Sequence, residues 1–218
     1  SMANRYGQVI DCHITYRKIY LEDTPYYVGT IRDMATLAKN RKKVVHLLNY
    51  DQLTGLPNRK VFLSQTSELL IESYQEVVVV RFNIDRYRDL AILSGPDGIN
   101  KLVENFVLRI TELELDNLRC FSHFGGDDFA LLFECNDANM VRHQLDSLMQ
   151  MCERPFFLND SVAKEAQVYC HISVGVSYFP ENGNEFIGLL TKAEKALNYV
   201  KQQGGDDVCW YHKSINER

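Results

Sequence analysis

The sequence lacks a long apolar segment, a paired cysteine motif and an excess of basic residues. No apolar run approaches the roughly 20 residues that a helix needs to cross a bilayer, and residues 1–4 have none of the apolar core of a signal peptide. We therefore expect a cytoplasmic protein. The formal net charge of -5 at pH 7 also argues against nucleic acid as a partner, because phosphate backbones are bound through clustered Lys and Arg side chains.

Cysteine and histidine are present but scattered. The cysteines form no CxxC pair, so buried, reduced thiols are a better interpretation than disulfides or zinc ligands. The histidines form no ligand cluster either, and each is interpreted as a surface or core residue. With 218 residues and 45% hydrophobic content, the chain is long enough to bury a substantial core. The six cysteines are Cys12, Cys120, Cys135, Cys152, Cys170 and Cys209.

The first 48 residues predict a hairpin and a helix. Residues 9–21 and 26–32 are rich in Val, Ile, Thr and Tyr and flank the turn-forming stretch 22–25, which is typical of a β-hairpin. Two strands alone bury too little to be stable in water, so we expect this hairpin to belong to a larger sheet or to pack on another surface. Residues 34–48 place apolar side chains among Lys and Arg, which predicts a helical connector.

Beyond Asp51, strand and helix signals alternate. The pattern predicts a mixed α/β (α+β) domain with βαβ units and a central sheet covered by helices. Helices are expected from a cap at Asn58 to about Tyr74, and over 97–112, 139–153 and 185–203, and strands over 77–84, 118–123, 129–134, 168–178 and 208–211.

One of the expected turns carries two glycines followed by two carboxylates. Gly125 and Gly126 would let the backbone approach a polyphosphate closely, and Asp127 and Asp128 could hold Mg²⁺ beside it. The same residues also suit a tight hairpin with solvated acids. The turn by itself leaves both interpretations open.

Five segments resemble motifs of the GGDEF family of diguanylate cyclase-like domains. Residues 51–59 (DQLTGLPNR) are similar to its opening motif, and residues 124–129 (FGGDDF) to its naming signature. The resemblance covers about residues 47–211 without a forced gap, so the chain is identified as a member of this family. The other segments are NIDRYR at 83–88, ISVGVS at 172–177 and AEKAL at 193–197, the last continuing to Lys201 and Gly204.

The resemblance implies the nucleotide-cyclase palm-like fold of the family, with a central, mostly antiparallel sheet surrounded by helices. Residues 27–33 (YVGTIRD) resemble the last strand of a PAS sensor domain and its exit. The expected domains are the C-terminal part of a PAS-like domain (1–33), a helical signalling linker (34–48), a GGDEF domain (49–213) and a tail (214–218).

Active members of the family join two GTP molecules into cyclic-di-GMP, and each subunit of a dimer presents one GTP with Mg²⁺. The partners that the resemblance implies for this chain are GTP, a PAS-type sensor upstream, an EAL-type phosphodiesterase downstream and a second copy in a homodimer. Mg²⁺ is expected only if a nucleotide is bound.

Several metal-binding and catalytic positions depart from the family pattern. Asn83 stands where the family has its first metal-binding Asp, and it loses the negative charge that Mg²⁺ prefers. Asp127 matches the second metal ligand. Asp85 shares the strand face of Asn83 and is a weak substitute, although a strand-end acid is the better interpretation. Asp128 replaces a longer Glu near the attacking hydroxyl, where a misplacement of about 1 Å can cost on the order of a hundredfold in rate.

The nucleotide contacts are altered as well. The family's two guanine-holding positions fall on Ala91, which offers no hydrogen bond, and Asn100, which supplies one acceptor and a competing donor. We expect GTP binding to weaken by about a hundredfold or more. Lys201 matches a phosphate-contacting Lys, but Gly205 takes the place of its partner Arg. His123 stands where an Arg commonly precedes the signature.

Three functions therefore compete. The chain is a weak diguanylate cyclase that uses Asp127, Asp128 and Asp85 around Mg²⁺, a GTP-sensing module, or a pure interaction module that relays a PAS-type signal. Asp127, Lys201 and the glycine turn support the second function. We favour the last two together, with interaction slightly ahead, and so expect a degenerate, regulatory GGDEF domain with little or no cyclase activity.

Overall fold

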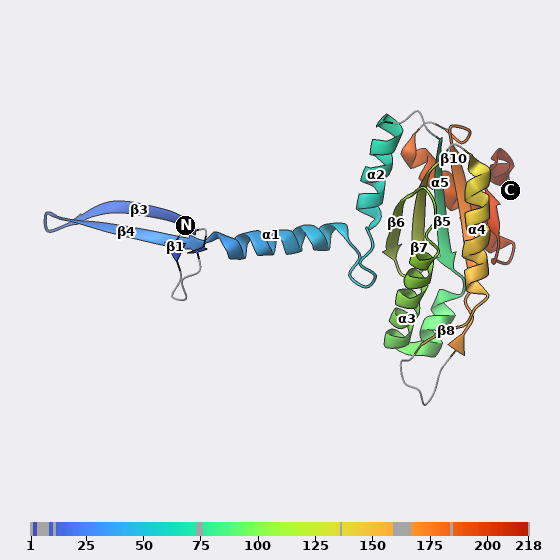
Figure 1. Ribbon diagram of the computed structural model, residues 1–218, viewed down its shortest axis with the longest axis horizontal. Coiled ribbons are helices and arrows are strands. Elements are labelled where there is room, and N and C mark those ends of the chain that lie inside the picture. Colours follow the sequence, from blue (N-terminus) through green and yellow to red (C-terminus); the bar gives the residue numbers. More distant parts are fainter. Residues whose placement is uncertain are drawn as a thin grey trace. The chain divides into compact units, whose positions relative to one another are not determined.

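The computed structural model describes residues 2–3, 9–10, 12–72, 76–135, 137–158, 167–183 and 185–217, and the chain falls into two compact units, residues 1–48 and 49–218 (Figure 1). The predicted helix end near Tyr74 lies outside the described residues, and the predicted burial of Cys135 concerns a side chain that the structure does not describe. No helix within the described ranges is long and apolar enough to span a membrane.

The first unit contains the predicted β-hairpin. Its strands β3 (Cys12–Leu21) and β4 (Thr24–Asp33) pair antiparallel over their full lengths. The turn is shorter than the predicted stretch 22–25, because only Glu22 and Asp23 connect the strands, with φ angles of 46° and 64°. Two-residue connections with positive φ at both positions match the twist of paired strands, so the ladder continues to the turn.

Shorter elements complete this unit. A second antiparallel pair consists of two-residue strands, and a helix follows β4 directly. These elements are β1 (Met2–Ala3), β2 (Val9–Ile10) and α1 (Met34–Asn49).

The second unit is built on a five-stranded sheet. Every neighbouring pair of strands is antiparallel except β10 and β11, which are parallel. This arrangement confirms the predicted central, mostly antiparallel sheet of a mixed α/β fold. In spatial order the strands are β11 (Val208–Trp210), β10 (Ile172–Phe179), β5 (Glu76–Ile84), β7 (Asp128–Cys135) and β6 (Leu118–Gly125).

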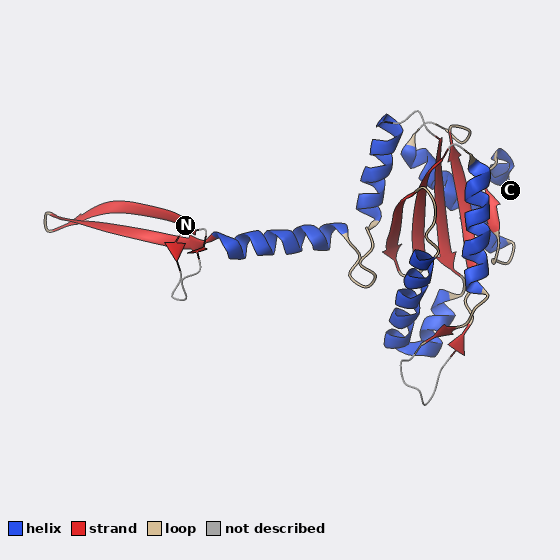
Figure 2. Cartoon of the chain, in the orientation of Figure 1, coloured by secondary structure: helices blue, strands red, loops and turns tan. Residues whose placement is uncertain are grey.

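Helices cover both faces of this sheet (Figure 2). Alternate residues of β5 point to opposite faces, so Val78 and Val80 pack in the core under α3 and α4, whereas Val77 and Val79 pack under α2 and α5. Because both faces of β5 are buried, this strand is apolar along most of its length. The helices are α2 (Arg59–Glu72), α3 (Tyr87–Glu112), α4 (Ala138–Cys152) and α5 (Phe186–Gln202).

Two predicted boundaries differ from the structure. Helix α3 begins at Tyr87 rather than Asp97 and continues across a kink at Gly95, where φ is 68° and ψ is 178°. Pro96 follows the kink at a position where a missing N–H is tolerated. The single strand predicted over 168–178 is divided, because β9 (Gln167–Val168) pairs with β8 (Phe156–Phe157) and not with the central sheet.

The remaining details concern the helix cap and the cysteines. The predicted cap is confirmed, because the Asn58 side-chain oxygen accepts hydrogen bonds from the N–H groups of Lys60 and Val61. The 3-10 helix η1 (Lys213–Glu217) is the last element of the unit.

Cys12 and Cys209 are half-buried rather than buried as predicted. The free thiols of Cys120, Cys152 and Cys170 are buried, and burial raises the pKa of Cys170 to about 12.

Candidate functional site

The turn that connects β6 to β7, which we call the signature turn (residues 125–128), lies at one end of the sheet. Gly125 and Gly126 have φ angles of 110° and 62°, which glycine adopts without strain. The carbonyl of Asp127 accepts hydrogen bonds from the N–H of Ile84 (3.3 Å) and from Nδ2 of Asn83 (3.1 Å). The end of β5 therefore holds the turn in place.

A cavity of about 450 Å³ opens beside this turn. It is lined by three cationic side chains and two carboxylates, and one of the cations, Arg86, is paired with Asp89 outside the lining. Nζ of Lys201 lies 3.8 Å from Oδ2 of Asp127. Burial and the negative charge of Asp127 raise the pKa of Tyr87. The lining residues are Ile84, Asp85, Arg86, Tyr87, Arg88, Asp127, Lys201, Gly204 and Gly205.

Both carboxylate oxygens of Asp85 are occupied by protein donors. Oδ1 accepts a hydrogen bond from the Ser173 hydroxyl (2.6 Å), and Oδ2 accepts one from the N–H of Asp206 (2.9 Å). Gly205 lies against this carboxylate with φ at 81°, and a Cβ at this position would sit 2.8 Å from Oδ2. Asp85 thus organises the loop after α5, and a side chain at position 205 would require the Asp85 carboxylate to shift.

Asp128 is held by an arginine from the centre of the sheet. Nη2 of Arg81 forms an ion pair with Oδ2 of Asp128, and Nη1 lies 2.9 Å from Oε2 of Glu194 on α5. The Arg81 side chain is only 6% exposed and also packs against the ring of Phe124. Oδ1 of Asp128 is buried. The Asp128 carboxylate is therefore engaged under α5 and does not line the cavity.

The family model for the diguanylate cyclase, GGDEF domain, matches residues 48–207. The chain belongs to the GGDEF family. This membership confirms the family that the motifs predicted.

Individual relatives agree with this assignment. The chain is 24% identical over 194 residues to the signaling protein YkoW of Bacillus subtilis, covering 86% of the chain and 23% of YkoW. It is 23% identical over 187 residues to the bifunctional diguanylate cyclase/cyclic di-GMP phosphodiesterase MucR of Pseudomonas aeruginosa, covering 83% of the chain and 26% of MucR. The chain spans about a quarter of the length of these curated relatives.

A solved structure shares the fold. The GGDEF domain of TpbB from Pseudomonas aeruginosa superposes on the chain with a TM-score of 0.72 at 21% identity, covering 78% of this chain and 98% of that one. The fold of the second unit is thus the GGDEF fold.

The GGDEF fold brings only some of the predicted site residues together. Asp85, Asp127 and Lys201 line the cavity, whereas Asp128, Ala91 and Asn100 do not. Gly125, Gly126 and Asn83 shape the signature turn beside it. Ala91 is half-buried and Asn100 is exposed, both on α3, on opposite sides of its kink.

The cavity residues Arg86, Tyr87 and Arg88 were not predicted from the sequence, and neither was the role of Arg81. The role of Arg81 could have been predicted, because Arg81 is the one charged residue within the apolar run 77–84. A charge buried in such a strand requires a partner, and the nearest acids of the signature were candidates.

The described residues do not fit a magnesium site made by the protein alone. Asp85 gives its oxygens to protein donors, and Asn83 directs its amide nitrogen at a carbonyl. Asp127 remains, 35% exposed and facing Lys201. Mg²⁺ prefers several oxygen ligands with at least one carboxylate. Within the part of the chain that the structure describes, no group of three or more His, Cys, Asp or Glu side chains is placed to hold a metal ion.

The opening motif of the GGDEF domain forms a compact loop that docks on β6. Oδ1 of Asp51 accepts hydrogen bonds from the N–H (2.8 Å) and the hydroxyl (2.8 Å) of Thr54, and the carbonyl of Pro57 accepts one from the N–H of His123 (3.1 Å). Burial alone would raise the pKa of Asp51, but hydrogen bonds from His123 and Thr54 outweigh burial and hold this pKa below its ordinary value. The loop is thus built around an ionised Asp51.

Proposed function

We propose that this chain is a regulatory GGDEF module of a bacterial cyclic-di-GMP signalling protein, acting in the cytoplasm with little or no diguanylate cyclase activity. The pairing of Asp128 with Arg81 carries the proposal. In active members, as the family resemblance implies, the residue at this position lies near the attacking 3′-hydroxyl. Oδ2 of Asp128 is paired with Arg81, Oδ1 is buried, and the side chain does not line the cavity, so this carboxylate is not placed to accept the proton of that hydroxyl. The first step of the reaction would therefore lack its base.

The guanine-reading positions support the same conclusion. Ala91 has no hydrogen-bonding group, and Asn100 is exposed and does not line the cavity. Each unmatched polar contact costs roughly 1 to 3 kcal/mol, so the two changes weaken GTP binding by about a hundredfold or more.

The phosphate contacts are also reduced. Lys201 supplies one positive charge, and the neighbouring Asp127 offsets part of it. Gly205 replaces the second cation of active members, and a longer side chain there would meet the Asp85 carboxylate at a strained backbone position. Where a nucleotide brings Mg²⁺, the ion would be held mainly by phosphate oxygens, with Asp127 as its protein ligand.

The partners of such a module are a PAS-type sensor before it, an EAL-type phosphodiesterase after it and a second copy of the chain. MucR, a relative of this chain, is described as a bifunctional diguanylate cyclase/cyclic di-GMP phosphodiesterase, and the chain spans about a quarter of its length. A module without turnover would act on such neighbours through contacts or through bound GTP.

Two observations favour specific alternatives. The cavity beside the signature turn presents the cationic side chains of Arg88 and Lys201 to a phosphate-bearing ligand, which supports a GTP-sensing role over a pure interaction role. The partly exposed carboxylate of Asp127 supports a weak diguanylate cyclase that converts two GTP to cyclic-di-GMP and pyrophosphate. The pairing of Asp128 argues against the second alternative.

Two assays on the full chain separate these functions. In a thermal-shift titration with GTP and Mg²⁺, a GTP-sensing module melts at a temperature that rises with GTP concentration, whereas a pure interaction module shows no rise. The rise should disappear in Lys201→Ala and persist in Lys195→Ala, which removes the same charge from another position of α5. Chromatography of a GTP reaction should reveal no sustained cyclic-di-GMP formation, and formation that Asp127→Ala abolishes would refute the proposal.

A further inference from the structure

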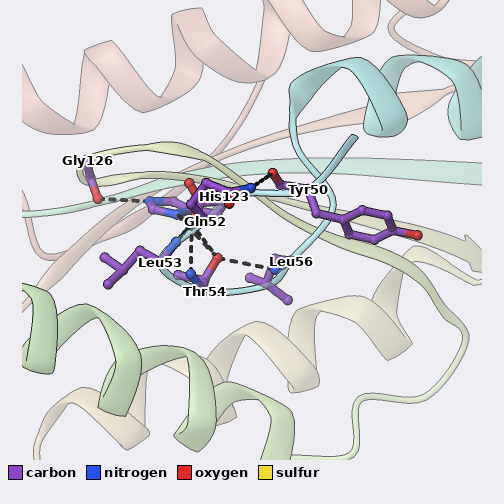
Figure 3. Close-up of polar contacts among 8 residues, drawn as sticks. Tyr50, Gln52, Leu53, Thr54, Leu56, His123 and Gly126 are labelled. Atoms are coloured by element: carbon purple, nitrogen blue, oxygen red, sulfur yellow. Dashed lines mark hydrogen bonds and ion pairs between the residues drawn. The ribbon is translucent and has the colours of Figure 1, made fainter. Parts of the chain in front are cut away.

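His123 on β6 lies between the opening motif and the signature turn (Figure 3). Its side chain is 2% exposed, and its ring stacks on Phe129 with 4.4 Å between centroids. Nδ1 lies 2.9 Å from Oδ1 of Asp51 and 3.4 Å from the hydroxyl oxygen of Thr54. Nε2 lies 3.0 Å from the carbonyl oxygen of Gly126. Each ring nitrogen therefore faces an oxygen.

The oxygens around the ring are all acceptors. The Asp51 carboxylate and the Gly126 carbonyl have no proton to donate, and the Thr54 hydroxyl directs its proton to Asp51. A neutral imidazole carries one N–H and one lone pair, so it would set a buried lone pair against an oxygen on one side. Both contacts are hydrogen bonds only when both ring nitrogens carry protons. The arrangement of His123 is therefore that of an imidazolium ion.

The two hydrogen bonds of His123 are not equal. The bond to Asp51 joins opposite charges and is the stronger one, whereas the bond to Gly126 ends on a neutral carbonyl. When the ring loses one proton, the remaining proton stays on Nδ1 and the carbonyl of Gly126 is released. The groups facing the ring are Asp51, Thr54, Gly126 and Phe129, and among these four Asp51 carries the charge.

We propose that His123 is a proton-operated clamp, which ties the opening motif to the signature turn when its ring is doubly protonated and releases the turn when one proton is lost. The clamp closes as the pH falls, because the imidazolium form is needed. It opens again only in strong acid, where Asp51 takes up a proton. An arginine, which commonly stands at this position in the family, keeps its charge at every relevant pH and makes no such switch.

Solution NMR on the full chain tests the clamp without any substitution. Both ring nitrogens of His123 should carry protons at the acidic end of a pH titration, and only one of them at the basic end. Over the same range, the hydrogen-exchange protection of the Ile84 amide, which donates to Asp127 in the signature turn, should fall by about tenfold once intrinsic exchange is corrected.

Two variants sharpen this test. His123→Arg should keep the protection of the Ile84 amide constant across the range, because its charge is permanent. His143→Arg, at an exposed position of α4, should keep the pH dependence of the native chain. A His123 ring with one unprotonated nitrogen at the acidic end of the titration, or pH-independent protection of Ile84 in the native chain, would overturn the proposal. Both measurements stand even if His123→Arg does not fold.

Discussion

Replacement of Arg81 tests the contact on which the proposed function depends. Arg81→Met keeps the length of the side chain but removes its charge, and it leaves Asp128 and Glu194 without their partner. We expect a large loss of stability, because Asp128 would then be an uncompensated carboxylate inside the fold.

The size of the loss follows from burial. Removing one partner of a fully buried ion pair costs about 3–5 kcal/mol. The side chain of Asp128 is 24% exposed and that of Glu194 is 47% exposed, so water screens part of this cost. We expect Arg81→Met to lower the free energy of unfolding by about 2–3 kcal/mol, and a double-mutant cycle with Asp128→Asn to give a coupling energy of about 1.5 kcal/mol.

Urea unfolding followed by the fluorescence of Trp210 provides the assay. The chain contains one tryptophan, and it lies on β11 of the same sheet, so its signal reports the unit that holds Arg81. The matched control is the cycle of Arg86→Met with Asp89→Asn, because these side chains are 82% and 55% exposed. The control pair should couple by less than about 0.5 kcal/mol. Equal coupling energies in the two cycles would refute the reasoning.

Three further outcomes are expected. Gly175→Ala should lower the stability of the chain in thermal unfolding by at least about 3 kcal/mol, because the new methyl group would overlap backbone atoms of α5. Gly188→Ala, which places its methyl group in open space, should cause no such loss. Gly205→Arg should lower the melting temperature without improving GTP binding, since the new side chain meets Asp85 at a positive φ; tighter binding would contradict this account. The stabilising contribution of Asp51 should be complete above about pH 4 and be lost at lower pH, because its pKa is lower in the folded state, and acid titration of Asp51→Asn should lack this component.

Much of the fold followed from local patterns. The apolar run 77–84 predicted the central strand, and the Asn58 cap and the glycine pair of the signature turn were visible in the sequence because they depend on neighbouring residues. The kink at Gly95 was not predicted, because a Gly-Pro pair is more often a helix boundary than a bend within a helix.

The site was less predictable for a physical reason. Asp127 and Lys201 were predicted from the resemblance to the family motifs, and Asp85 was given as a weak substitute ligand from strand alternation; all three line one cavity. The engagement of Asp128 by Arg81 joins residues 47 positions apart across two strands, and only the register of β5 with β7 brings them together. Of the two acceptors around His123, Gly126 follows it closely in the chain, whereas Asp51 comes from a segment that is distant in sequence.

Turnover measured against protein concentration tests the central claim most directly. Active members of the family work as dimers. A cyclase whose dimer dissociates at low concentration would therefore form cyclic-di-GMP at a rate that rises faster than linearly with protein concentration. We expect no sustained cyclic-di-GMP formation from GTP and Mg²⁺ at any concentration of the full chain. Product whose rate rises steeply with concentration and disappears in Asp127→Ala, but not in Asp146→Ala on the exposed face of α4, would contradict it.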